Sequence, residues 1–165
     1  MNNIIFRKMK KTVLMALLML LSVCGAQAQV QQGDIAVGAN VVYGSLTESF
    51  GFGGRFQYGL FDNVRLEGNF NCFAKHKHIS CWDLNMNAEY LLGVWQDKVY
   101  LYPIAGMNVT FAELAGDDEN HVGLNLGAGV EYEITEHIGV SAEYRHTIIK
   151  DVDQGVFGIG VNYKF

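Results

Sequence analysis

The segment Val156-Phe-Gly-Ile-Gly-Val-Asn-Tyr-Lys-Phe165 alternates between two kinds of residue along its whole length. Every second position carries a large apolar side chain, and the positions between them are mostly small or polar. Because successive side chains of a β-strand point to opposite faces, this period of two predicts a strand with one apolar face. That apolar face carries no charge from one end of the segment to the other. We expect such a face to lie against lipid, on the outside of a closed barrel.

The first 28 residues have the three parts of an export signal. A basic head at residues 7–11 precedes an apolar run at residues 12–23, and Ala26-Gln27-Ala28 supplies the small residues that a signal peptidase accepts. We therefore expect cleavage before Gln29, which leaves residues 29–165 as the mature chain. The apolar run is too short to be a transmembrane helix.

The mature chain is expected to be one domain of 137 residues. Loss of the leader removes four basic residues and no acidic one, so the net charge falls from −5 to −9. This charge argues against nucleic acid as a partner. One proline and 19 glycines fit a protein of strands and turns better than a helical bundle. A lipoprotein acylated at Cys24 is an alternative, but the bulky Val23 before it disfavours that modification.

The alternating pattern recurs upstream, and the sequence predicts eight strands. Their expected ranges are 34–44, 52–61, 64–71, 82–90, 99–111, 122–132, 138–145 and 156–165. Short connections at 62–63, 92–97 and 133–137 would lie on the side of the termini, and longer loops at 45–51, 74–80, 112–120 and 150–153 on the opposite side. Since Pro103 cannot donate a hydrogen bond to a ladder, a bulge is expected there.

A soluble barrel would have the same number of strands with the apolar face turned inward, so the direction of that face must be decided. Glycine is frequent on the polar face, where it suits the crowded interior of a narrow barrel. Aromatic residues of the apolar face gather near the strand ends, as in the two girdles of membrane barrels. These aromatics are Tyr43, Phe52, Trp82, Phe111 and Phe157 at one end and Tyr58, Tyr90, Tyr132, Tyr163 and Phe165 at the other. The sequence therefore predicts an all-β fold, an eight-stranded antiparallel up-and-down transmembrane β-barrel.

Three segments carry a resemblance to a known family: Gly123-Leu-Asn-Leu-Gly-Ala-Gly-Val-Glu-Tyr132, Ile138-Gly-Val-Ser-Ala-Glu-Tyr-Arg145 and the terminal Tyr163-Lys-Phe165. Over residues 29–165 the chain resembles the small outer-membrane barrels of Gram-negative bacteria, the outer membrane protein A and X type. No peptidoglycan-binding domain like that of the A type is expected after the barrel, so the barrel-only X type is the better match. The resemblance implies that Tyr163 and Phe165 form the signal that the barrel-assembly machinery recognises.

Charged residues on the inward face form the first candidate site. Four cations and five anions are expected inside the barrel: Arg55, Arg65, Arg145 and Lys164 with Glu67, Asp83, Glu89, Glu131 and Glu143. Because a buried charge must be paired, we favour a structural salt-bridge network that fills the lumen. The A-type relatives are thought to switch such a network to conduct ions, so a narrow, porin-like gated channel remains an alternative.

A second candidate site lies at Cys72-Phe-Ala-Lys-His-Lys-His-Ile-Ser-Cys81. A disulfide between Cys72 and Cys81 could staple this hairpin, although the alternation places the two residues on opposite faces. A metal site from both cysteines with His76 and His78 is a weaker alternative, because the spacing matches no zinc-finger pattern. No metal or cofactor is therefore expected.

An enzymatic function is disfavoured by the placement of the nucleophile and base candidates. Some small outer-membrane barrels are lipid A deacylases or acyltransferases, with a serine and a histidine near the outer leaflet. Here Ser141 and Glu143 are expected inside the barrel and His146 on the lipid side, so they cannot converge as a triad.

The sequence therefore predicts an integral outer-membrane protein with a structural role in envelope integrity. A surface adhesion or host-interaction protein is the alternative, and the acidic segment 113–119 is the only plausible interaction surface. The expected partners are outer-membrane lipid and lipopolysaccharide, with the assembly machinery during biogenesis. We expect a monomer.

Overall fold

The computed structural model describes residues 30–46, 48–76, 79–95, 98–114, 117–149 and 152–165. Nine antiparallel strands make up nearly all of this part of the chain: β1 (Ile35–Gly44), β2 (Ser49–Phe61), β3 (Val64–His76), β4 (Ile79–Tyr90), β5 (Leu92–Trp95), β6 (Val99–Leu114), β7 (Asp117–Glu133), β8 (Ile138–Ile149) and β9 (Val152–Lys164). Among the described residues, no helix is long and apolar enough to span a membrane.

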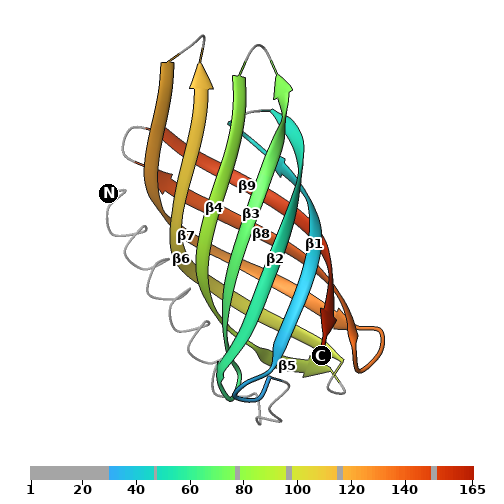
Figure 1. Cartoon of the computed structure of the whole chain (residues 1–165). Coiled ribbons are helices and arrows are strands. Elements are labelled where there is room, and N and C mark those ends of the chain that lie inside the picture. Colours follow the sequence, from blue (N-terminus) through green and yellow to red (C-terminus); the bar gives the residue numbers. More distant parts are fainter. Residues whose placement is uncertain (1–29, 47, 77–78, 96–97, 115–116, 150–151) are drawn as a thin grey trace, which may run out of the picture.

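The strands close into a barrel because the first and last of them pair. β1 pairs with β2 on one side and with β9 on the other, and the other neighbours along the chain pair in turn except β4 and β5. β4 and β5 both pair with β6, in one register as far as Gly93, and form a single interrupted strand. The predicted eight-stranded up-and-down barrel is therefore confirmed (Figure 1).

The interruption between β4 and β5 lies opposite Pro103. Ile104 pairs with Glu89 of β4 and Leu101 pairs with Leu92 of β5, so Pro103 falls between these two pairs. Proline lacks the N–H that the ladder needs, which accounts for the break. The expected bulge at Pro103 is wrong, because β6 runs past it against β7 without a shift in register.

The apolar faces of the strands point outward, as predicted. Met86 is 72% exposed and Leu126 is 54% exposed, whereas the neighbouring Asn87 and Asn125 are each 1% exposed. The polar side chains thus make up the interior of the molecule. Only lipid or detergent can cover an outer surface of this kind, because a soluble barrel would bury its apolar residues.

The strands are longer than expected at one end of the barrel. β6 and β7 contain 16 and 17 residues, compared with roughly 9–11 for a strand that crosses a membrane. Much of the loops expected at 74–80 and 112–120 is paired strand: His76 pairs with Ile79, and Leu114 pairs with Asp117. Beyond Phe73 and Gly123 these strands lose their pairing with β2 and β8 and continue as a four-stranded extension.

We name the end with this extension the hairpin rim and the opposite end the terminal rim. Figure 1 shows the β3–β4 and β6–β7 hairpins rising at the hairpin rim, with β5 and the C-terminus at the terminal rim. The predicted tight turn lies at the terminal rim, where Asn63 has a left-handed φ of 64°. Residues 92–97, expected to be a connection, contain β5. The predicted leader, residues 1–28, lies outside the described residues.

Candidate functional site: the barrel lumen

Two arginines organise the charged part of the lumen. Arg55 on β2 reaches across the barrel to form an ion pair with Glu143 on β8, and its Nη1 lies 3.4 Å from Glu67 Oε2 on β3. Arg55 Nη1 also donates a hydrogen bond of 3.2 Å to Ser141 Oγ. The Arg55 side chain has no exposed surface. These contacts join opposite walls of the barrel through charge-assisted hydrogen bonds.

Arg65 forms the second centre, closer to the terminal rim. Its Nε donates to Glu89 Oε2 at 2.7 Å, and its Nη1 donates to Glu131 Oε2 at 3.1 Å. The guanidinium carbon lies 5.3 Å from the centroid of the Tyr102 ring, a cation–π distance. The Tyr102 hydroxyl in turn donates to Glu143 Oε1 at 2.9 Å, which connects the two arginine centres.

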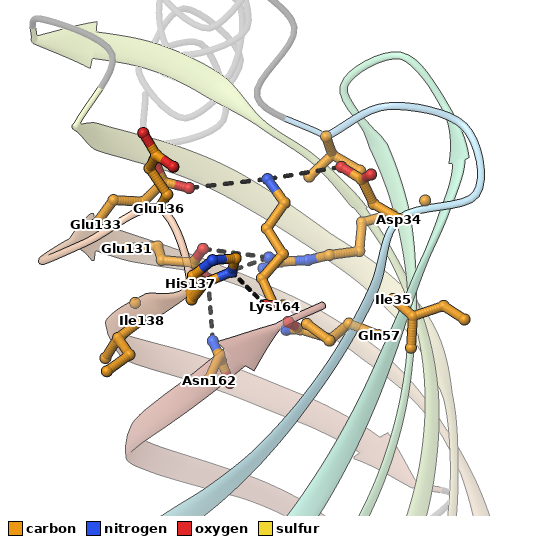
Figure 2. A pocket seen from close by; sticks show the side chains of 15 residues that line it. Asp34, Ile35, Gln57, Glu131, Glu133, Glu136, His137, Ile138, Asn162 and Lys164 are labelled. Atoms are coloured by element: carbon orange, nitrogen blue, oxygen red, sulfur yellow. Dashed lines mark hydrogen bonds and ion pairs between the residues drawn. The ribbon is translucent and has the colours of Figure 1, made fainter.

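The other three predicted lumen charges lie apart from these two centres. Asp83 Oδ1 accepts hydrogen bonds of 2.7 Å from both Asn71 and Asn85. Arg145 is 3% exposed, and no carboxylate among the described residues forms an ion pair with it. Lys164 lies at the terminal rim, where its Nζ is 3.6 Å from Asp34 and 4.0 Å from Glu133 (Figure 2).

The terminal rim also holds a small cavity of about 30 Å³. It lies among side chains that Figure 2 labels, including Gln57, Glu131, Asn162 and Lys164. Asn162 Nδ2 donates a hydrogen bond of 3.1 Å to Glu131 Oε2. A volume of this size has room for one or two water molecules but not for a substrate.

A layer of asparagines fills the lumen between the arginine centres and the hairpin rim. Asn85 Oδ1 accepts hydrogen bonds of 2.8 Å from both Asn108 and Asn125, and Asn125 Oδ1 accepts one of 2.7 Å from Thr147 Oγ1. The predicted lumen network contained only charged residues, so this asparagine layer was not part of it. The available signal was asparagine at every second position, as in Asn85 and Asn87.

An apolar cluster of inward-facing residues lies at each end of this polar interior. The cluster at the terminal rim, which we name the terminal cap, consists of Val30, Leu91, Tyr100, Tyr102 and Ile104. The cluster at the hairpin rim, which we name the hairpin cap, consists of Val42, Phe73, Cys81 and Val156. Every member of both caps is at most 6% exposed. Tyr100, Tyr102 and Ile104 of the terminal cap face inward, which explains why β6 carries apolar residues on both of its faces.

Three buried carboxylates come close enough to suggest a metal site. Glu67, Glu89 and Glu143 each offer an oxygen within 4.8 Å of the others. However, Arg55 Nη1 already bridges Glu67 and Glu143, and Arg65 Nε holds Glu89. The positive charge that such a cluster needs is therefore supplied by two guanidinium groups.

The two cysteines do not form a disulfide in the structure. Both thiols are free, with Cys72 exposed on the outer surface and Cys81 buried in the hairpin cap. Cys72 pairs with Trp82 and Cys81 pairs with Phe73, so adjacent ladder positions direct the two thiols to opposite faces. The side chains of His76 and His78, the other members of the metal alternative, lie outside the described residues.

The residues weighed for catalysis are separated by the barrel wall. Ser141 and Glu143 point into the lumen, where both contact Arg55. His146 lies on the outside, with its Nε2 3.7 Å from Asp153 Oδ2. A hydroxyl nucleophile and its base must be within hydrogen-bond distance, and this geometry does not allow it.

Comparison with known proteins agrees with this geometry. A sequence model described as the outer membrane protein beta-barrel domain matches residues 13–165. The chain belongs to that family. Such barrels extend farther on the outer side than on the periplasmic side, so the protruding β3–β4 and β6–β7 hairpins identify the terminal rim as the periplasmic one. No match was found among curated protein sequences.

Several solved outer-membrane barrels share the fold of this chain. The N-terminal β-barrel domain of Pseudomonas aeruginosa OprF has 21% identity and a TM-score of 0.70 over 81% of this chain and 98% of that one. Neisserial surface protein A has 22% identity and a TM-score of 0.59 over 80% and 96%. Ail, the attachment invasion locus protein of Yersinia pestis, has 18% identity and a TM-score of 0.58 over 82% and 100%. At these identities the similarity shows the fold alone.

Proposed function

We propose that this outer-membrane barrel is a closed structural protein that contributes to envelope integrity and does not conduct ions. The observation that carries the proposal is the filled lumen with its two apolar caps. Ion-pair and amide networks fill the lumen beside and between the two caps, and apolar constrictions exclude water from narrow pores. A hydrated ion would have to displace both caps and break buried ion pairs to pass.

The first experiment measures conductance of the purified protein in planar lipid bilayers. We expect no steady conductance from the unchanged chain, and also none from Arg145→Ala, because both caps remain in place. Glu131→Ala is the companion variant, since it leaves part of the Arg65 guanidinium unpaired at the terminal rim. A regular, voltage-independent current in the unchanged protein would show that the lumen is open and would refute the proposal.

A second experiment tests the role in the envelope. In the producing bacterium, deletion of the gene should increase uptake of an apolar dye that an intact outer membrane excludes. Complementation with the unchanged gene should restore exclusion, and so should a variant with both cysteines replaced by serine. Normal dye exclusion in the deletion strain, at confirmed expression of the protein in its parent, would contradict a structural role.

The proposal also includes export with cleavage before Gln29, assembly guided by Tyr163 and Phe165, and a monomer in contact with lipid and lipopolysaccharide.

Surface adhesion is a second candidate, and the four-stranded extension favours it. Only two residues separate β3 from β4 and β6 from β7. The strands of these two hairpins nevertheless extend past the point where their pairing with β2 and β8 ends. Shortening the β6–β7 hairpin by equal numbers of residues on both strands would preserve its register. If adhesion is the function, binding of the bacterium to host cells should fall while folding of the barrel is unchanged. Equal binding to host cells by bacteria with the unchanged and with the shortened hairpin would exclude adhesion as the function.

A further inference from the structure

The segment before the first strand contributes to the terminal cap. Val30 is 5% exposed and packs with Leu91, Tyr100, Tyr102 and Ile104 inside the terminal rim. The four other members belong to the barrel wall, on β6 or at the junction of β4 and β5. Val30 therefore closes the rim from a segment that precedes the first strand. On the predicted cleavage before Gln29, it would be the second residue of the mature chain.

Main-chain hydrogen bonds hold this segment against β2 and the turn that follows it. Asn63 N donates to Val30 O at 3.0 Å, Gly33 N donates to Gly59 O at 2.8 Å, and Gly59 N donates to Asp34 O at 2.8 Å. Within the segment, Asp34 N donates to Gln31 O at 3.1 Å and Gly33 has a left-handed φ of 95°, so the segment is a turn that the rim holds through its main chain.

The rim also has space reserved for this segment. A Cβ atom at Gly59 would overlap the Gln31 carbonyl oxygen and come within 2.8 Å of Val30 Cγ1. The side chain of Asp34 fixes the segment at its other end, because it accepts a 2.9 Å hydrogen bond from Gln31 N and lies 3.6 Å from Lys164 Nζ. Residues from both ends of the barrel sequence therefore hold the segment in place.

We propose that residues 30–34 are a peptide plug, bound in cis at a site built for it, that seals the terminal rim. The site recognises a main-chain turn, a small branched apolar side chain at its first position and an acidic side chain four residues later. Release of the plug opens the inner face of the terminal cap to water while the wall of the barrel stays closed. This proposal adds a removable part to the sealed lumen proposed above, and it rests on that proposal.

The test measures how fast a reagent reaches the cap. In a chain with Cys72→Ser and Cys81→Ser, Ile104→Cys places a thiol in the cap, and a charged maleimide labels it in the folded, detergent-solubilised protein. Burial of a valine side chain favours the docked form by about 10- to 100-fold. We therefore expect Val30→Asp to increase the labelling rate by about 10- to 100-fold. Gly59→Ala should increase it too, because the added methyl group displaces the segment.

Two matched controls separate release of the plug from general loosening. Gln32→Asp adds the same charge at an exposed position of the segment, and Gly68→Ala adds a methyl group where nothing lies within 4 Å. Both should label as slowly as the parent, and all variants should keep heat-modifiable gel migration. Equal labelling rates in the parent, Val30→Asp and Gly59→Ala, whether fast or slow, would overturn the plug. Conductance of the unchanged protein is a separate measurement, so the sealed lumen can stand if the plug fails.

Discussion

Arg65→Met removes the guanidinium that holds Glu89 and Glu131 together inside the barrel. Both carboxylates are at most 7% exposed, so water cannot replace the lost partner. Removal of one partner of a buried ion pair costs about 3–5 kcal/mol, because the other charge is left uncompensated. We expect the free energy of unfolding to fall by about that amount. Lys164→Met is the matched control: its pairs are longer and its side chain is 28% exposed, so about 0–1 kcal/mol is expected.

The measurement is urea unfolding of the protein folded in lipid bilayers, followed by tryptophan fluorescence and by heat-modifiable migration. A triple variant that adds Glu89→Gln and Glu131→Gln to Arg65→Met removes the stranded charges along with their partner. It should recover much of the lost stability, since replacing a whole buried ion network by neutral groups is often nearly neutral. A loss in Arg65→Met no larger than that in Lys164→Met would refute the argument that the lumen is a dry, paired core.

Three further variants test other parts of the structure by the same unfolding measurement. Leu126→Arg places a charge on the lipid-facing surface near mid-bilayer and should lower the free energy of unfolding by about 2–4 kcal/mol. The control Glu136→Arg, at an exposed position of the terminal rim, should be tolerated. Comparable losses of stability in both variants would contradict the inside–outside assignment. Tyr102→Phe removes one hydrogen bond to a buried carboxylate and should lower the free energy of unfolding by about 1–3 kcal/mol. An unchanged stability would show that the Tyr102 hydroxyl is not a donor. Gly127→Ala should cost about 1–3 kcal/mol because its methyl group would overlap the main chain of β8, while Gly68→Ala, which faces open space, should show little change.

The inside–outside assignment of the strands could be predicted because it depends on a local rule. Period-two alternation fixes which side chains share a face, whatever the partner strand is. A surplus of apolar residues on one face, with glycine on the other, then favours lipid outside. The exposed Leu126 and the buried Asn125 confirm this prediction at adjacent positions.

The strand ends at the hairpin rim could not be predicted in the same way. Residues 74–80 and 112–120 contain charged and polar residues on both faces, which is typical of loops. Their strand structure comes from pairing between neighbours, since Ser80 pairs with Glu113 and Glu113 pairs with Asp118. Beyond the membrane the outer face no longer has to be apolar, so the pattern that reveals a membrane strand is lost there.

The contacts within the lumen could not be predicted from the sequence either. Alternation places Arg55 and Arg65 inside but does not say which carboxylate each one meets, because Arg55 and Glu143 are 88 residues apart. The same limit applies to Lys164, whose inward position at the end with the termini could be predicted although its contact with Asp34 could not. Pairings across a barrel depend on stagger and tilt, which the chain sets only when it closes.

Closure of the lumen has a consequence for where this protein can act. A soluble protein derives its stability from an apolar core, but here the core is polar and the apolar surface faces outward. The ion pairs and amide hydrogen bonds of the lumen then limit how the interior can pack. The surfaces left for interaction are the lipid-facing belt and the two rims. At the hairpin rim the extension offers strands and at the terminal rim the plug offers a peptide site, so we expect partners of this barrel to bind at its ends.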